Sequence, residues 1–345
     1  MTRHCFAVVI GILSAVVSAC GPSPAIQKEL AKRPRVGLLM DTLAKEERWT
    51  RDRDLFVERA DRLGAEVMVE SGERDDAKQL QLAESLLERG VRALVVVPHS
   101  AEAAAKIVEA AKKRSVPVIS YDRLILKADI DLYLSYDNRM VGEQQAQYLR
   151  NRAPKGNYIL LGGAPTDHNA KLVREGQMGV LEDAVKRSDI KIVADPWVPD
   201  WRAEAAMQLT EEALKKANNK VVAVVASNDV TAGGAIQALE KHGLAGKVLV
   251  SGQDANLEAV RRLVNGMQTM TVYKPLRPIA LWAANAAVQM AKGEKVEGTS
   301  TVDNGLKQVP ALLWTPTVID KDQIPILIND RFHTKDQIYG SAGAK

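Results

Sequence analysis

Cysteine and aromatic residues are scarce in this sequence of 345 residues. The two cysteines, Cys5 and Cys20, fall within the first 20 positions, which excludes a disulfide framework and a cysteine-based metal site in the rest of the chain. Only 4% of the residues are aromatic, so each tryptophan calls for an explanation. The formal net charge is only +4. This excess is spread along the chain, without the basic arm or stripe that is typical of nucleic-acid-binding proteins.

Motifs for nucleotide binding, metal binding and nucleophilic catalysis are also absent. The sequence has no P-loop, no G-x-G-x-x-G fingerprint and no G-x-S-x-G elbow. Its five histidines are scattered and form no pair at metal-ligand spacing. The carboxylates of Asp122, Asp167 and Asp254 could serve as an acid–base set, but their basic and amide neighbours suit the holding of hydroxyl groups equally well. We therefore predict no enzyme, no cofactor and no metal.

The N-terminus has the pattern of an export signal. A short basic start precedes the uncharged run Cys5 to Val17, which is shorter than the roughly 20 residues of a membrane span and fits a secretory signal. The sequence Val17-Ser18-Ala19-Cys20 resembles a bacterial lipoprotein signal, in which Cys20 is lipidated and becomes the mature N-terminus. An ordinary cleaved signal with an incidental cysteine is the alternative. We expect a signal peptide at 1–19 and a flexible stalk at 20–33.

Short β-branched runs alternate with longer amphipathic stretches from Pro34 onward. Most of the runs are nearly continuous, as is typical of strands that are covered on both faces of a parallel sheet. The predicted strands are Val36–Met40, Glu66–Val69, Ala93–Val97, Val118–Ser120, Tyr158–Leu161, Lys191–Val193, Val221–Ala226, Val248–Ser251 and Thr269–Tyr273. The predicted helices are Arg53–Leu63, Leu80–Leu87, Ala103–Ala111, Val141–Leu149, Ala203–Leu214 and Ala255–Val264. This alternation predicts an α/β fold with two doubly wound parallel sheets.

Polar loops follow the predicted strands. Ligands of doubly wound sheets bind at the carboxyl ends of the strands, so we expect function in these loops. They are Asp41-Thr42, Pro98-His99-Ser100, Tyr121-Asp122-Arg123, 162–167, Ser227-Asn228-Asp229 and Gly252-Gln253-Asp254. Together they supply carboxylate, amide, guanidinium and hydroxyl groups for planar hydrogen bonding.

Several of these loops belong to longer stretches with a recognisable pattern. The stretches are Glu47–Asp54, Ser120–Arg123, Asp167–Lys171, Ala226–Leu239, Ser251–Ala255 and Gln268–Pro275. In this order they resemble the D-xylose-binding proteins of bacterial ABC transporters, and the resemblance runs from about Val36 to about His333. It implies two Rossmann-like domains, joined by three hinge strands, that close on one sugar. The implied lobes are 34–136 plus 275–303 (N-terminal) and 137–274 plus 304–340 (C-terminal). The implied crossings are Tyr136–Asn138, Tyr273–Lys274 and Asn304–Leu306.

The resemblance also implies which residues contact the sugar. They are Arg48, Trp49, Asp122, Arg123, Asp167, Asn169, Arg174, Trp201, Asn228, Asp254 and Lys274. Asn228 and Asp254 also precede helical patterns and are candidate helix N-caps. We expect the other three tryptophans, Trp197, Trp282 and Trp314, to pack in hydrophobic cores.

These residue types suit an uncharged sugar. Each hydroxyl donates one hydrogen bond and accepts two, which carboxylate, amide and guanidinium groups satisfy together. Because the ligand carries no charge, the acidic and basic groups should balance within the protein. An indole ring, that of Trp201 above all, offers a rigid apolar surface for the C–H face of a pyranose.

The resemblance implies the lipid-anchored binding subunit of an ABC sugar importer. It would act as a monomer in the periplasm or at the cell surface and deliver a monosaccharide, D-xylose before others, to a membrane permease. A sensor that presents the sugar to a membrane histidine kinase or chemoreceptor is the alternative, and neighbouring genes distinguish the two. A sugar-modifying enzyme would not return its ligand unchanged. A repressor needs a helix-turn-helix where this chain has its export signal.

Overall fold

A computed structural model of the protein describes residues 33–44 and 47–340. The segment from Pro34 onward is a unit by itself. The expected signal peptide, Cys20 and all of the expected stalk except Arg33 lie outside the described residues.

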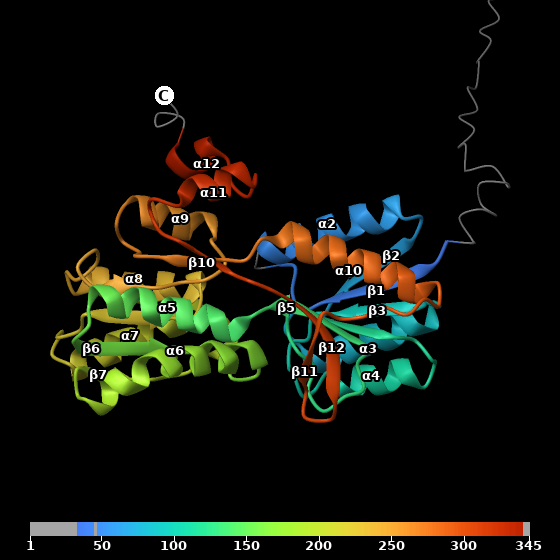
Figure 1. Ribbon diagram of the computed structural model, residues 1–345, viewed down its shortest axis with the longest axis horizontal. Coiled ribbons are helices and arrows are strands. Elements are labelled where there is room, and N and C mark those ends of the chain that lie inside the picture. The colour runs from blue at the N-terminus through green and yellow to red at the C-terminus, as the bar shows by residue number, and fades with distance from the viewer. Residues whose placement is uncertain (1–32, 45–46, 341–345) are drawn as a thin grey trace, which may run out of the picture. The chain divides into compact units, whose positions relative to one another are not determined.

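The first lobe is built on a sheet of seven strands (Figure 1). Its order is β11-β12-β5-β4-β3-β1-β2, and only β11 runs antiparallel to its neighbour. The bounds are β1 Arg35–Met40, β2 Glu66–Ser71, β3 Ala93–Val96, β4 Val118–Tyr121, β5 Leu132–Tyr136, β11 Ser300–Asp303 and β12 Gln308–Trp314. One core lies between the sheet and the helices α2 Glu47–Arg62 and α10 Leu276–Ala291. The other lies under α3 Asp76–Glu88 and α4 Ala105–Lys112.

The second lobe repeats this plan with a smaller sheet. Its parallel strands are, in order, β7 Ile190–Ala194, β6 Gly156–Leu161, β8 Ala223–Ala226 and β9 Leu249–Val250. A bridge between Gln253 and Val272 joins this sheet to β10 Thr271–Tyr273, which pairs with β13 Thr317–Ile319. One face is covered by α5 Asn138–Arg152 and α6 His168–Lys186. The other is covered by α7 Ala203–Lys216, which follows the short helix η1 Pro199–Trp201, and by α8 Asp229–Lys241.

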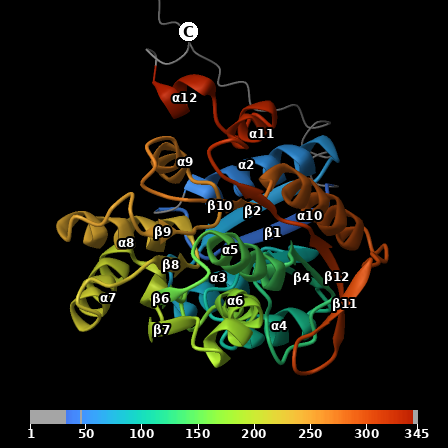
Figure 2. The same ribbon diagram turned by 60° about the vertical axis from the view of Figure 1, so that its left-hand side comes forward.

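A third cluster completes the second lobe at the C-terminal end of the chain. There α9 Leu257–Val264, α11 Ile324–Asn329 and α12 Lys335–Tyr339 pack together (Figures 1 and 2). Because Tyr273 and Ile319 belong to the same cluster, it also covers the strands β10 and β13.

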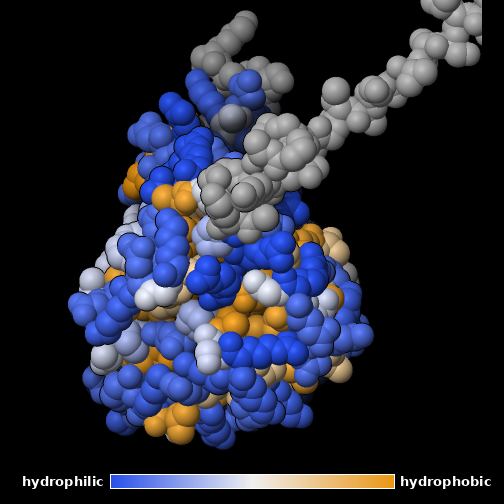
Figure 3. Space-filling model, turned by 90° about the vertical axis from the view of Figure 1, so that its right-hand side faces the viewer, coloured by the Kyte–Doolittle hydropathy of each residue, from blue (hydrophilic) through white to orange (hydrophobic). Residues whose placement is uncertain are grey.

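The strand order is the same in the two lobes, β2-β1-β3-β4 in the first and β7-β6-β8-β9 in the second. The order reverses between β1 and β3 and again between β6 and β8, which creates a ligand crevice at the carboxyl ends of these strands. The predicted fold class, α/β with two doubly wound parallel sheets, is confirmed. The amino ends of the first-lobe strands surround a different hollow with Val91, Pro117 and Met290 in its lining. Seen from this side, the surface is mostly hydrophilic around an apolar patch (Figure 3).

The chain passes between the two lobes three times. It does so between β5 and α5, between β10 and α10, and between β12 and β13. The expected third crossing at Asn304–Leu306 is wrong. The assignment of 304–340 to the second lobe is therefore wrong for the first residues of this range. β12 pairs with β5, so the chain remains in the first lobe as far as Trp314. Residues 304–307 form instead the turn between β11 and β12, where the Asn304 amide donates to the carbonyls of Ile125 and Ala128.

Helices α5 and α6 approach each other closely through glycine. A Cβ on Gly142 of α5 would overlap the carbonyl oxygen of Val173, and one on Gly176 of α6 would overlap that of Arg139. Because the first turn of α6 faces the other lobe, through Asn169 and the Asp122 carbonyl, this contact also fixes the place of that turn.

We predict that Gly176→Ala lowers the free energy of unfolding by about 1–3 kcal/mol, because the added methyl group must push the two helix backbones apart. Urea denaturation of the protein measures the change. Gly179→Ala on the same helix is the matched control, since a Cβ there meets nothing within 4 Å. That substitution should be neutral or stabilise by up to about 1 kcal/mol. Equal stabilities of the two variants would contradict the close approach.

Candidate functional site

A small cavity lies between the two lobes and gathers most of the predicted contact residues. Its lining is Arg48, Trp49, Asp122, Arg123, Asn138, Asp167, Asn169, Val173, Trp201, Asn228, Gln253, Asp254 and Lys274. Ten of the eleven predicted residues are in this set, although they are spread over more than 200 positions of the chain. Each lobe contributes side chains, so the cavity depends on the lobes being together.

Two kinds of position bring these side chains to the cavity. The first is the carboxyl end of a strand: Asp122 and Arg123 follow β4, and Lys274 follows β10. The second is the start of a helix. Asp167 caps α6 by accepting from the backbone N–H of Asn169 at 2.9 Å, and Asn228 caps α8. Both positions follow from the doubly wound topology, in which each strand leads into a helix at the same edge of the sheet.

Arg48 joins the carboxylates of the two lobes. Its guanidinium forms an ion pair with Asp122 of the first lobe and another, at 3.1 Å, with Asp254 of the second. Lys274 reaches the same Asp254 oxygen at 3.2 Å. Asp52 lies one helical turn after Arg48 in α2, and its Oδ2 is 3.5 Å from the Arg48 Nε. These groups are almost completely buried, so water screens their attraction only weakly.

Arg123 makes a second connection between the lobes. Its Nη1 donates to Asp41 of the first lobe at 2.7 Å, and its Nε lies 2.8 Å from Asp167 of the second. His99 Nδ1 lies 3.1 Å from the other oxygen of Asp41. Asp41 and His99 do not line the cavity but hold Arg123 in place. The hydrogen bond to Asp41 raises the pKa of His99.

The charges that line the cavity balance. Three cations, Arg48, Arg123 and Lys274, stand against three carboxylates, Asp122, Asp167 and Asp254. Burial by itself would raise the pKa of Asp122, but Arg48, Lys274 and Arg123 outweigh it and hold this pKa below its usual value. Burial would likewise lower the pKa of Arg48, yet Asp122 and Asp254 raise it well above normal. For Asp167 burial prevails over Arg123, and its pKa is raised.

Two tryptophans, one from each lobe, complete the lining. Trp49 is 2% exposed and lies beneath Arg48, whose guanidinium carbon is 4.5 Å from the ring centroid. Trp201 lies so close to Gly163 that a Cβ there would overlap its ring. Within the described residues, neither indole N–H has a hydrogen-bond partner, although both are buried. A buried donor without a partner costs about 1–3 kcal/mol, and both tryptophans line the cavity.

Several lining residues have an unfavourable backbone conformation. Asp122, Trp201 and Asp254 have φ angles of 63°, 58° and 95°. These angles lie in the left-handed region, which residues other than glycine rarely adopt. Such conformations cost about 1–3 kcal/mol each and concentrate at functional sites. The strain therefore supports a functional role for this cavity.

Arg174 is the predicted residue that does not reach the lining. Its guanidinium pairs with Asp195, its Nε donates to Gln177 at 3.0 Å, and it lies over the ring of Trp197. These partners hold the side chain within the second lobe. Without Arg174, the lining charges are equal in number rather than basic by one.

Three lining residues were not predicted: Asn138, Val173 and Gln253. Gln253 stands next to Asp254 in a loop that the sequence did single out, and its buried Oε1 has no partner among the described residues. Asn138 begins α5 at the first crossing between the lobes. Val173 lies on α6 one turn after Asn169, a helical spacing that places both side chains on one face.

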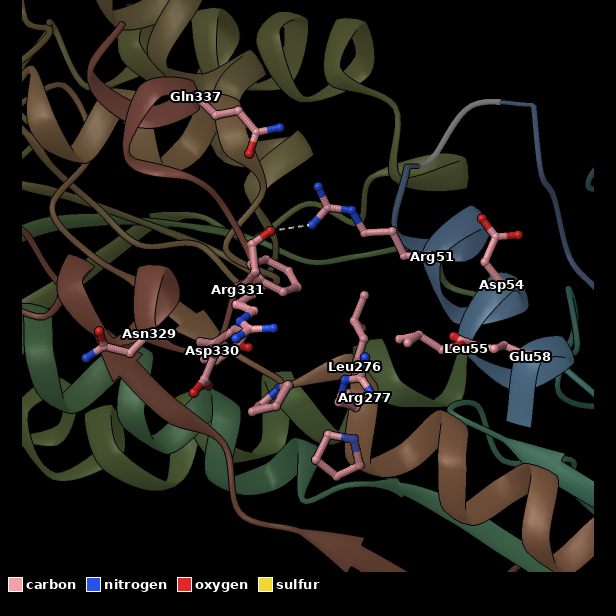
Figure 4. Close-up of a pocket in the computed structure, with 14 residues that line it drawn as sticks. Arg51, Asp54, Leu55, Glu58, Leu276, Arg277, Asn329, Asp330, Arg331 and Gln337 are labelled. Atoms are coloured by element: carbon pink, nitrogen blue, oxygen red, sulfur yellow. Dashed lines mark hydrogen bonds between the residues drawn. The ribbon is translucent and has the colours of Figure 1, made fainter. Parts of the chain in front are cut away.

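A wider hollow lies beside the cavity, next to the second crossing. It is bordered by Arg51 and Glu58 of α2, by Pro275, and by the C-terminal segment around Phe332 (Figure 4). Arg51 donates to the backbone carbonyl of Phe332 at 2.7 Å, a further contact between the lobes. None of the residues predicted to contact a ligand lines this hollow.

The described residues give no indication of a metal centre or of membrane insertion. In residues 33–44 and 47–340, no group of three or more His, Cys, Asp or Glu side chains is arranged to hold a metal ion. Within the same ranges, no helix has the length and hydrophobicity that a membrane crossing requires.

Residues 36–295 match the family model described as periplasmic binding protein domain. The chain belongs to this family. It is therefore a binding protein and not an enzyme, as the sequence predicted. The chain is 49% identical to a D-xylose-binding periplasmic protein of Haemophilus influenzae, over 90% of this chain and 93% of the relative. It is 47% identical to the D-xylose-binding periplasmic protein of Escherichia coli K12, over 89% and 93% of the two chains.

Solved structures agree with this family assignment. A carbohydrate transporter solute-binding protein from Chloroflexus aurantiacus, solved in complex with D-glucose, superposes with a TM-score of 0.83. The two sequences are 30% identical, and the match covers 88% of this chain and 97% of the other.

The buried Asp52 gives the periplasmic binding protein a testable pH dependence. Burial raises the pKa of Asp52 to about 6, although Arg48 and the Tyr121 hydroxyl oppose the shift. An Asp in the unfolded chain has a pKa of about 3.9. From about pH 4 to about pH 6 the folded state therefore holds this proton more tightly than the unfolded state.

We predict that wild type loses stability relative to Asp52→Asn as the pH rises through this range, by up to about 1.4 kcal/mol per pH unit. Above about pH 6, the difference in stability between the two proteins should become constant. Urea unfolding of both proteins from pH 4 to pH 7 measures this difference. Asp54→Asn, an exposed carboxylate on the same helix, is the control. For each variant, the difference from wild type in the free energy of unfolding is compared across the pH range. If this difference has the same pH dependence for Asp52→Asn and Asp54→Asn, the raised pKa of Asp52 is wrong.

Proposed function

We propose that this protein is the sugar-binding subunit of an ABC importer and that D-xylose is its ligand. The observation that carries the proposal is the interlobe cavity, in which balanced buried charges and two indole rings meet. The D-xylose-binding relatives, at 47% and 49% identity, support the same ligand.

The cavity offers both kinds of hydrogen-bonding group that a sugar needs. Carboxylates such as Asp122 and Asp254 accept from hydroxyl hydrogens, while Asn228, Lys274 and the guanidinium groups donate to hydroxyl oxygens. Bonds to charged groups are the stronger ones. Because the lining charges balance, a neutral sugar leaves no uncompensated charge in the closed protein.

Selectivity follows from the same groups. A sugar with a misplaced hydroxyl leaves a buried partner unsatisfied, at a cost of about 1–3 kcal/mol. The ring of Trp201 gives the C–H face of the sugar a rigid apolar surface, and the unpartnered indole N–H groups of Trp49 and Trp201 are suited to hydroxyl oxygens.

Ligand contacts from both lobes would favour the closed form. The population shift is limited by the difference between the affinities of the open and closed forms. In the proposed cycle, a monomer closes on one sugar, and the permease subunit recognises the closed lobes. The protein would work in the periplasm or at the cell surface, anchored by a lipid on Cys20.

We predict that isothermal titration detects D-xylose binding at one site per chain, and that Trp201→Ala weakens it by about 1–3 kcal/mol through loss of the stacked surface. Trp282→Ala removes a tryptophan that is 41% exposed on α10, outside the cavity lining, and should leave the affinity unchanged. The absence of heat with every pentose and hexose tested would overturn the proposed function. Equal affinities of Trp201→Ala and wild type would exclude ligand contact by this ring.

The proposed lipid anchor has a separate test. Cys20→Ser should move the protein from the membrane fraction to the soluble fraction of cells, because the acyl chains that hold it are attached at this residue. D-xylose affinity should not change. A Cys20→Ser protein that still sediments with membranes would refute the anchor.

A further inference from the structure

Two strained turns, one from each lobe, are in contact. In the first lobe, Glu73 and Arg74 have φ angles of 53° and 65°, between β2 and α3. In the second, Asp200 and Trp201 have φ angles of 52° and 58°. Consecutive left-handed residues without glycine persist only where their surroundings hold them.

A hydrogen bond joins the two turns. Arg74 Nη1 donates to the backbone carbonyl of Asp200 at 3.0 Å. Arg74 is not part of the cavity lining, whereas Trp201 is. The bond therefore connects a first-lobe side chain that is not part of the lining to the residue before Trp201 in the second lobe.

The acceptor belongs to the peptide group that leads into Trp201. The Asp200 carbonyl and the Trp201 N–H are parts of one planar unit. The N–H donates to the Val198 carbonyl within the second lobe at 3.2 Å, and the carbonyl accepts from Arg74 of the first lobe. This peptide plane is thus held on opposite sides by the two lobes, and its orientation sets the direction in which the indole leaves the backbone.

The Arg74 turn is itself firmly attached to the first lobe. The Arg74 N–H donates to the carbonyl of Asp41 at 3.1 Å. The Glu73 carboxylate accepts from the Thr42 hydroxyl at 2.8 Å and from the Leu43 N–H at 3.1 Å. The guanidinium therefore extends from a fixed base rather than from a free loop.

We propose that Arg74 is a positioning residue for ligand binding, which holds the Asp200–Trp201 peptide in the closed form and so sets the indole of Trp201 against the sugar. This inference rests on the proposed function. Separation of the lobes breaks the bond, so Arg74 acts on the closed complex and not on the first encounter with the sugar.

Arg74→Ala tests the inference, with D-xylose as the probe. Alanine meets the same backbone restriction at φ 65° as arginine does, so the change removes the side chain without adding strain. We expect about tenfold weaker binding, the usual worth of a hydrogen bond from a charged donor. Stopped-flow measurements should find the loss in the dissociation rate, with the association rate within about twofold of wild type. Arg74→Lys, which keeps the charge and a donor, should recover part of the loss.

Arg114→Ala is the matched control. Arg114 also donates to a backbone carbonyl, that of Glu84 at 3.3 Å, but within the first lobe. Its removal should leave both rates unchanged. The urea midpoint of the sugar-free Arg74→Ala protein identifies any general loss of stability.

A double-mutant cycle with Trp201→Ala decides whether Arg74 acts through this tryptophan. If it does, Arg74→Ala costs about tenfold in the wild-type background and less than about twofold in the Trp201→Ala background. An equal loss in both backgrounds, or wild-type affinity of Arg74→Ala, overturns the inference while the proposed function stands. If the wild-type protein binds no sugar at all, both fall.

Discussion

The buried ion pairs across the cleft are the constraint on which the rest of the structure depends. Arg48 connects Asp122 of one lobe with Asp254 of the other, and Arg123 does the same for Asp41 and Asp167. Burial of a charge costs several kcal/mol unless a partner of opposite charge and good geometry lies within reach. Each arginine has a carboxylate partner in its own lobe, but Arg48 reaches Asp254 and Arg123 reaches Asp167 only when the lobes are together, so these two ion pairs link the site to closure.

The fold supplies this arrangement by repetition. Both lobes use the same strand order, and in both the polar residues follow the carboxyl ends of the strands. Close contacts at glycine residues then determine where individual side chains and helices lie. Gly163 gives space to the ring of Trp201, and Gly142 and Gly176 let α5 and α6 pack closely, which places the first turn of α6 at the cavity. Rigid elements therefore carry most of the lining, while the strained residues Asp122 and Asp254 direct individual carboxylates into it.

Sequence patterns were sufficient for the parallel cores and insufficient where local and distant interactions compete. All nine predicted strands exist, and most of them are nearly continuous apolar runs, as is typical of strands that are covered on both faces of a sheet. β5, β11, β12 and β13 were missed. The resemblance implied an interlobe crossing at Asn304–Leu306, and only the distant pairing of β12 with β5 identifies this segment as a hairpin turn. Pairing between segments so far apart in sequence leaves no local signal.

For the site, too, sequence was sufficient where the signal is local and insufficient where it depends on distant contacts. Ten of the residues predicted to contact the ligand line one cavity. Arg174 could not be separated from them by sequence, because its partner Asp195 is brought close only by the fold. Trp197 and Trp282 were expected in cores, yet they are 37% and 41% exposed. Trp49, by contrast, is almost fully buried beneath two arginines. Asp41 stands in a loop where function was expected, and Asp52 stands in a stretch that carries the resemblance, but neither was predicted as a site residue. Both act through the arginines that they hold.

A crystal structure of the D-xylose complex tests the central claim most directly, namely that charges balanced within the protein enclose a neutral ligand between the lobes. We expect one sugar in the interlobe cavity, with its hydroxyls within hydrogen-bond distance of Asp122, Asp254 and Asn228 and its ring against Trp201. A sugar bound instead in the hollow beside Arg51, or a cavity whose charged groups contact only one another in the complex, would contradict the claim.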